Sequence, residues 1–292
     1  IIASIEFKYI NFSMIIWIAS YPKSGNTWVR SFLSSYYFTT DGNFNFDLLK
    51  NIKQFPSREF FKRKLTSINE AAENWLIPQR EIKLRGKACF LKTHNVYGSY
   101  KGKSFTTNEF TLGAINIIRD PRNIITSLMN HYSLDENSAL KMIGSVHRNL
   151  KDTKDEDDYS NYTFISSWSN NYNSWKAAKK FRTLMIKYED LEINREQTFI
   201  KIVKFINDLI NKKEVINQLK LRKSIETTNF ETLKKLEQDY GFSEAADNTN
   251  GKKKKIFFNL GNRNNYKKLL KKKTISSIEE LFGKEMKEIG YL

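Results

Sequence analysis

The sequence contains little cysteine and histidine, and it has neither long apolar runs nor internal repeats. Cys89 is the only cysteine among 292 residues, which excludes an intrachain disulfide. We expect it to lie buried in the middle of a strand, which fits a reducing cytoplasm. No apolar run approaches the roughly 20 residues that a membrane-spanning helix needs. Because 40% of the residues are hydrophobic, the chain can bury a sizeable core, and one soluble α/β domain is the simplest organisation.

Acidic residues are also few. The 49 Lys and Arg residues exceed the 32 Asp and Glu residues, so the formal net charge is +17. Such a charge suits nucleic acid, an anionic membrane surface or a polyanionic acceptor. The basic residues are spread along the chain, however, without an aromatic-interleaved stripe or a helix-turn-helix pattern. A dedicated nucleic-acid module is therefore not expected.

The first 13 residues lack the layout of a signal peptide. Lys8 interrupts their apolar stretch and no small-residue cleavage site follows. The chain does not begin with methionine, and Met14 directly precedes the first expected strand. We therefore expect Met14 to be the natural start, residues 1–13 to be a non-native or flexible extension, and residues 14–292 to form the functional domain.

The stretch from Ile15 to Leu33 reads as a buried strand, a Pro-Lys-Ser-Gly-Asn-Thr turn and a helix. This arrangement predicts a phosphate site, because the backbone N–H groups of Ser24, Gly25, Asn26 and Thr27 would face an anion at the helix N-terminus. Lys23 adds a mobile positive charge. The loop is not a Walker A motif, since its lysine precedes the glycine by two positions.

A second motif of the same kind spans Ala114 to Tyr132. Its apolar run predicts a buried parallel strand, with Asp120 as the N-cap of the helix that follows and Pro121 as its first residue. Arg119 then lies at the end of the strand, and Ser127 follows eight residues later, about two helical turns on. This motif places a second cationic group at the end of a strand, although an arginine here, taken singly, would more often form an ion pair with Asp120 or another surface carboxylate.

A third strand, within Lys87 to Asn95, ends in Lys92, Thr93 and His94. A lone histidine at the end of a strand is usually a structural hydrogen-bonder, so by itself it carries little information. Expected strands near residues 14–20, 88–93, 114–118 and 183–187 alternate with helices, which predicts a mostly parallel central sheet flanked by helices. Ligands gather at the carboxyl ends of such strands.

Together, these motifs resemble the PAPS-dependent sulfotransferases, in particular the cytosolic type and its bacterial-like members. The string YPKSGNTW, Tyr21 to Trp28, resembles the 5′-phosphosulfate loop of that family. The resemblance implies transfer of a sulfuryl group from 3′-phosphoadenylyl sulfate (PAPS) to a hydroxyl or amine, with 3′-phosphoadenosine 5′-phosphate (PAP) as product and no metal. It implies a general base at His94, charge stabilisation by Lys23 and Lys92, and 3′-phosphate contacts from Arg119 and Ser127.

The resemblance continues toward the C-terminus with less specific signals. Trp28 belongs to the 5′ loop, Tyr188 matches the tyrosine at the adenine end of the nucleotide, and Thr228 and Phe230 match a segment that packs on the adenine. We expect Trp168 and Trp175, seven residues apart, to pack in the core instead.

The C-terminal nucleotide loop departs from the family pattern. NLGNRNNYK, Asn259 to Lys267, keeps Gly261 but has Asn259 and Leu260 where the family has Arg and Lys. Arg263, or one of Lys252 to Lys255, could supply the missing charge. Near the C-terminus, TISSIE only partly resembles the dimer motif of the family, so a homodimer stays open.

The acceptor is not specified by these motifs. Segments 39–62, 95–110, 132–163 and 235–258 are the expected acceptor walls, and Ser243 to Gly251 is an expected lid. Phe44, Phe46, Tyr97, Tyr100 and Phe105 would suit a phenolic ring, but small-molecule, sugar, lipid and peptide acceptors all stay open. Two other functions also stay open: a nucleotide kinase or ATPase, and a non-catalytic protein that binds adenine nucleotides or polyanions.

Overall fold

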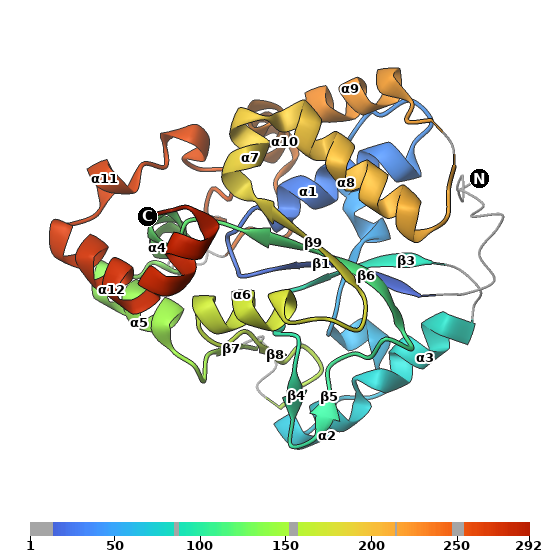
Figure 1. Cartoon of the computed structure of the whole chain (residues 1–292), viewed down its shortest axis with the longest axis horizontal. Helices are drawn as coiled ribbons and strands as arrows, with labels where there is room; N and C mark the ends of the chain where they lie inside the picture. Colours follow the sequence, from blue (N-terminus) through green and yellow to red (C-terminus); the bar gives the residue numbers. More distant parts are fainter. Residues whose placement is uncertain (1–13, 85–87, 152–156, 214, 247–253) are drawn as a thin grey trace.

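A computed structural model describes residues 14–84, 88–151, 157–213, 215–246 and 254–292. The suggested extension at residues 1–13 lies outside this range. Five parallel strands form the central sheet in the order β2-β3-β1-β6-β9. Their bounds are β1 Ile15–Ser20, β2 Lys53–Gln54, β3 Cys89–Thr93, β6 Thr111–Ile118 and β9 Arg182–Lys187. Figure 1 labels β3, β1, β6 and β9 of this sheet. The predicted α/β fold is confirmed, and four of the five strands match the predicted ones.

Helices cover both faces of the sheet (Figure 1). The side chains of β1 alternate between the two faces: Ile16 and Ile18 join one hydrophobic cluster, and Ile15 and Trp17 join another. One face carries α1 (Asn26–Phe38), α7 (Tyr188–Ile193), α8 (Arg195–Leu209), α9 (Gln218–Thr227) and α10 (Phe230–Tyr240), and the other carries α2 (Ile68–Asn74), α3 (Leu76–Leu84) and α6 (Trp168–Lys176).

A third hydrophobic cluster lies where α4 (Pro121–Tyr132), α5 (Glu136–Gly144) and α12 (Lys272–Ile289) pack together. Trp168 belongs to this cluster, with its ring 5.2 Å from that of Phe282, and Trp175 is buried in the cluster around Trp17. The expected core packing of both tryptophans is therefore confirmed. Cys89 differs from expectation, because it begins β3 and is only partly buried.

The sequence signals did not reveal the short elements. Two hairpins of two-residue strands form within the expected acceptor walls, where no apolar alternation is long enough to be read. The hairpins are β4 (Ser99–Tyr100) with β5 (Lys103–Ser104), and β7 (Asn149–Leu150) with β8 (Thr163–Phe164). The other short elements are η1 (Phe46–Asn51), η2 (Arg58–Phe60), η3 (Gly261–Arg263) and α11 (Tyr266–Leu269). Within the described residues, none of the helices is long and apolar enough to cross a bilayer.

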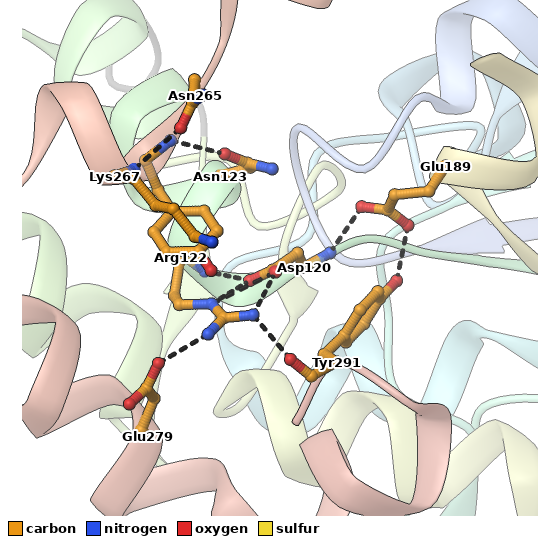
Figure 2. Close-up of polar contacts among 9 residues, drawn as sticks. Asp120, Arg122, Asn123, Glu189, Asn265, Lys267, Glu279 and Tyr291 are labelled. Atoms are coloured by element: carbon orange, nitrogen blue, oxygen red, sulfur yellow. Dashed lines mark hydrogen bonds and ion pairs between the residues drawn. The ribbon is translucent and has the colours of Figure 1, made fainter. Parts of the chain in front are cut away.

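A network of hydrogen bonds and ion pairs joins the start of α4 to the C-terminus (Figure 2). Its members are Asp120, Arg122, Glu189, Glu279 and Tyr291, and we call it the clasp. Asp120 caps α4, as predicted, by accepting a hydrogen bond from the backbone N–H of Arg122. The Arg122 guanidinium bonds Asp120 at 2.7 Å, Glu279 of α12 at 2.6 Å and the backbone carbonyl of Tyr291 at 2.8 Å. The Tyr291 hydroxyl donates to Glu189, whose carboxylate also accepts from the N–H of Asp120. The clasp therefore fixes the end of β6, and with it Arg119.

We expect Arg122→Ala to lower the free energy of unfolding by about 3 kcal/mol, because it leaves the buried Asp120 carboxylate without its cation. Arg182→Ala is the matched control. It breaks an exposed ion pair of 3.6 Å with Asp208 and should cost no more than about 0.5 kcal/mol. Urea unfolding followed by circular dichroism measures both values, and equal losses in the two variants would contradict the structural role of the clasp.

Candidate active site

Helix α1 begins without a side-chain cap. Gly25 is its N-cap and makes no side-chain hydrogen bond, and the first turn carries no acidic residue. The first intrahelical bond runs from the N–H of Val29 to the carbonyl of Gly25 at 3.2 Å. Within the described residues, the N–H groups of Asn26, Thr27 and Trp28 therefore have no acceptor, and together with the helix dipole they form an anion site.

The backbone of this loop is shaped by two residues with positive φ. Gly25 has φ +96°, and a Cβ there would lie 2.5 Å from the Tyr188 ring, so only glycine fits. Lys23 adopts φ 65° without being glycine, which is a strained conformation for a side-chain-bearing residue. Its carbonyl accepts a hydrogen bond of 3.0 Å from Arg119. The strained turn therefore joins the phosphate loop to the second predicted motif.

Arg119 follows β6 and is buried. Its guanidinium lies 4.0 Å from the centre of the Tyr188 ring and donates to the Ser127 hydroxyl at 3.3 Å. The Nε atom of Arg119 is buried without a hydrogen-bond partner in the described part of the chain. No carboxylate forms an ion pair with Arg119 there. The guanidinium therefore keeps donor capacity and charge for an anionic ligand.

Asn264, which the sequence motifs did not reveal as a site residue, also contacts Ser127. Its amide nitrogen donates to the Ser127 hydroxyl at 3.1 Å and to the Asn123 carbonyl at 2.9 Å, and its amide oxygen accepts from the hydroxyl of Thr126. Three positions before it, Gly261 has φ +53°, and a Cβ there would lie 2.5 Å from the Phe230 ring. The C-terminal loop thus reaches the cavity through neutral groups in place of the Arg and Lys of the family pattern.

His94 follows β3, and its ring nitrogens have different roles. Its Nδ1 lies 2.7 Å from the backbone carbonyl of Ser20. Because a carbonyl only accepts, Nδ1 carries the proton, and the lone pair on Nε2 has no donor among the residues that the structure describes. Burial, and next the positive charge of Lys92, lower the pKa of His94 to about 3. The imidazole is therefore neutral at physiological pH, as a proton acceptor must be.

Lys92 and Arg30 of α1 share one carboxylate. Glu244 lies 3.0 Å from the Nζ of Lys92 and 2.7 Å from the Arg30 guanidinium. Burial opposes the ionisation of Glu244, but its two cationic partners hold its pKa well below the usual value. Burial also lowers the pKa of Lys92. Two buried cations are thus balanced by one anion, so this cluster keeps a net positive charge.

The Lys23 ammonium lies 3.7 Å from the centre of the Phe257 ring. Burial, and then the charges of Arg119 and Lys92, lower the pKa of Lys23 to about 7. A bound anion would reverse part of this shift, since it favours the charged ammonium. The lowered pKa therefore reflects the cost of burying this charge beside two other cations, which a bound anion would reduce.

A cavity of about 410 Å³ brings these motifs together. The predicted site residues that line it are Lys23, Gly25, Asn26, Thr27, Trp28, Lys92, His94, Arg119, Ser127, Tyr188, Phe230 and Gly261. Three predicted residues are not among its lining. Ser24 is buried, and the prediction that its backbone N–H faces an anion is wrong, because this N–H donates to the Tyr21 carbonyl at 3.3 Å. Thr228 is buried with its hydroxyl donating to the Ser224 carbonyl at 2.6 Å, and Arg263 is exposed.

Sequence reasoning missed several residues of the lining. Gln54, Asn130, His131, Tyr132 and Glu244 reach the cavity from three separate segments. Of the lysines suggested for the C-terminal loop, Lys252 and Lys253 lie outside the described residues, and Lys254 and Lys255 bond backbone carbonyls near the cavity. The suggested lid, Ser243 to Gly251, is described only as far as residue 246.

Comparison with known proteins identifies the family. The model of the sulfotransferase domain matches residues 14–290. The chain belongs to the sulfotransferase family. Mouse (Mus musculus) sulfotransferase 1 family member D1 is 24% identical to it over 244 residues, which are 78% of this chain and 72% of the mouse protein. The family prediction made from the three motifs is confirmed.

Solved structures of sulfotransferase fold support the same architecture. A mouse sulfotransferase complexed with PAP is 19% identical, with a TM-score of 0.55 over 94% of this chain and 84% of the other. Retinol dehydratase in a complex with retinol and PAP is 16% identical, with a TM-score of 0.54 over 94% of this chain and 81% of the other. At these identities the likeness concerns the fold.

The sulfotransferase has no metal cluster in its described part, where no group of three or more His, Cys, Asp and Glu side chains could hold an ion. Metal-independent chemistry stays a prediction.

The low pKa of His94 gives a stability prediction. The pKa of a histidine in the unfolded chain is about 6.5, whereas burial lowers the pKa of His94 to about 3. The unfolded state therefore binds more protons between these two values. The free energy of unfolding should therefore fall as the pH drops from 6.5 toward 3. In His94→Gln this part of the decline should be absent. Urea midpoints across this range measure it, and identical pH profiles for the two proteins would contradict the shift.

Proposed function

We propose that the protein transfers a sulfuryl group from PAPS to an acceptor hydroxyl, with His94 as the general base. One observation carries the proposal. The uncapped N-terminus of α1, the Arg119 and Ser127 pair, and the free Nε2 of His94 all border one cavity. Two anion sites beside a neutral base match a nucleotide with phosphates at two positions and a group to be transferred. Solved relatives that hold PAP support this assignment.

The residues present fit such a nucleotide. The backbone N–H groups of Asn26, Thr27 and Trp28, which have no acceptor among the described residues, would hold the 5′-phosphate end. Lys23 would add its charge there. Arg119, whose Nε has no partner in the described part of the chain, would hold the 3′-phosphate together with Ser127 and Asn264. The rings of Tyr188 and Phe230 would flank the adenine. When bound, PAPS supplies the activated sulfuryl group.

His94 would take the acceptor proton on Nε2. Its Nδ1–H bond to the Ser20 carbonyl fixes the ring and would help to stabilise the imidazolium that forms. The negative charge of the nucleotide, beside Lys23 and Lys92, would raise the pKa of His94 from its low value in the free protein. The two lysines would also stabilise the charge that builds on the departing phosphate oxygen. Phe257 covers Lys23 and would limit access of water.

Calorimetry with PAP and ATP tests the nucleotide assignment. We expect the protein to prefer PAP, and Arg119→Ala to lose at least about tenfold in PAP affinity, since it removes a charge-assisted contact. Arg263→Ala, which removes an exposed arginine outside the cavity lining, is the matched control and should bind as the unchanged protein does. Tight ATP binding that is indifferent to Arg119 would favour a kinase or ATPase instead.

Kinetics test the base. His94→Ala should lower kcat by about 10²- to 10⁴-fold, the usual range for loss of a general base, while PAP affinity stays the same because His94 is not part of either phosphate site. PAP release from PAPS with an accepted substrate measures kcat. Turnover that survives the substitution would exclude His94 as the base.

The cytoplasmic location and a homodimer stay predictions.

A further inference from the structure

Three rings, each in contact with the next, line the cavity beside the phosphate loop. The Lys23 ammonium lies 3.7 Å from the centre of the Phe257 ring, and the centre of this ring lies 6.0 Å from that of His131. The His131 ring centre in turn lies 4.6 Å from that of Tyr132. All four residues line the cavity. We call Phe257, His131 and Tyr132 the ring row, and it leads from Lys23 to the end of α4.

Apolar side chains extend the surface of the ring row. Leu150 of β7 and Phe258 also line the cavity. The aromatic residues that were expected to suit a phenolic ring do not line it. They are Phe44, Phe46, Tyr97, Tyr100 and Phe105. The cavity therefore offers an apolar surface to an acceptor, but other residues than the expected ones provide it.

Arg148 lies beside the last ring of the row. It directly precedes β7, and its backbone carbonyl accepts hydrogen bonds from the N–H groups of Ile165 at 3.1 Å and Ser166 at 2.9 Å. Burial raises the pKa of the Tyr132 hydroxyl, and the charge of Arg148 lowers it in part. The guanidinium is therefore close enough to Tyr132 to act on its hydroxyl. This position is at the margin of the cavity that Tyr132 and Leu150 line.

This arginine has no counter-ion. Among the described residues no carboxylate forms an ion pair with Arg148, and its buried Nε has no hydrogen-bond partner. The Tyr132 hydroxyl likewise makes no hydrogen bond there, and because burial raises its pKa, it keeps its proton and can donate. A buried donor without a partner costs stability, which a ligand that accepts from it would recover. A guanidinium and a hydroxyl together suit a carboxylate.

The other charges of the cavity have a partner or a proposed ligand. Lys23 and Arg119 belong to the nucleotide in the proposed function. Glu244 is the only acidic residue among the lining residues that the structure describes, and it pairs with Lys92 at 3.0 Å. It would therefore repel an anion only weakly. Arg148 is left for a negative charge that the nucleotide does not supply.

We propose that the acceptor is a hydroxylated compound with an apolar body and a carboxylate, and that Arg148 and Tyr132 bind this carboxylate. The inference rests on the proposed sulfuryl transfer. The apolar body packs along the ring row, with its hydroxyl toward Lys23 and His94. This hydroxyl gives its proton to His94 Nε2 as its oxygen forms a bond to sulfur. The bond from sulfur to the phosphate oxygen breaks, and its electron pair leaves with PAP.

Three phenols that differ only in the end of one side chain test the acceptor class with the full chain. They are 3-(4-hydroxyphenyl)propionate, 4-ethylphenol and tyramine, whose side chains are anionic, neutral and cationic at neutral pH. Initial rates of PAP release from saturating PAPS give kcat/KM for each. We expect the propionate to exceed 4-ethylphenol by at least about tenfold, as one charge-assisted contact predicts, and tyramine to be the poorest acceptor.

Substitutions test the two named residues. Arg148→Met removes the charge and should lower kcat/KM for the propionate about tenfold, while the value for 4-ethylphenol stays the same. Arg148→Lys should keep more of the preference. Tyr132→Phe removes one donor and should lower the propionate value about threefold. Arg80→Met makes the same change at an exposed arginine outside the cavity lining and should alter none of the rates.

The outcomes separate this inference from the proposed function. Equal rates for the three phenols, a preference for 4-ethylphenol or tyramine, or turnover of none of them by protein that binds PAP would overturn the acceptor class and leave the nucleotide site intact. A preference that survives Arg148→Met, or an equal loss of all three rates in that variant, would overturn the role of Arg148. Failure to bind PAP would instead overturn the proposed function itself.

Discussion

The central position of β1 is the constraint on which the site depends. This strand is fully buried and pairs in parallel with β3 on one side and β6 on the other. Parallel pairing brings the carboxyl ends of neighbouring strands to the same edge of the sheet. Lys23, His94, Arg119 and Tyr188 each follow one of these ends. The Asn26 amide fastens the phosphate loop to this edge by donating to the Ile18 carbonyl at 3.0 Å and the Ser20 hydroxyl at 3.1 Å.

The distribution of counter-charges separates structural cations from those left for a ligand. Arg122 is neutralised by Asp120 and Glu279 and fixes the fold. Arg119 and Lys23 instead lie against aromatic rings, which attract a cation without cancelling its charge. Burial of such charges lowers the stability of the empty protein, and an anionic ligand would recover it. The lowered pKa of Lys23 has the same cause, because burial disfavours its charged form.

Much of the fold could be predicted because its signals are local. The apolar runs of β1, β3, β6 and β9 are long enough to be recognised, and Asp120 with Pro121 marks a helix start by its own chemistry. The hairpins could not be predicted, because strands of two residues are stabilised by their tertiary surroundings and carry no periodicity. Cys89 was misjudged for a related reason: whether the first residue of a strand is covered depends on neighbouring segments.

The sequence by itself determined the family, the parallel α/β architecture and most of the residues around the cavity, since each motif carries its residues at fixed spacing along a strand end. Only the tertiary structure decided which distant side chains join them. Asn264 reaches Ser127, and Glu244 reaches Lys92, across more than a hundred residues of chain. Such contacts depend on how loops close over the sheet, and no local pattern encodes that closure.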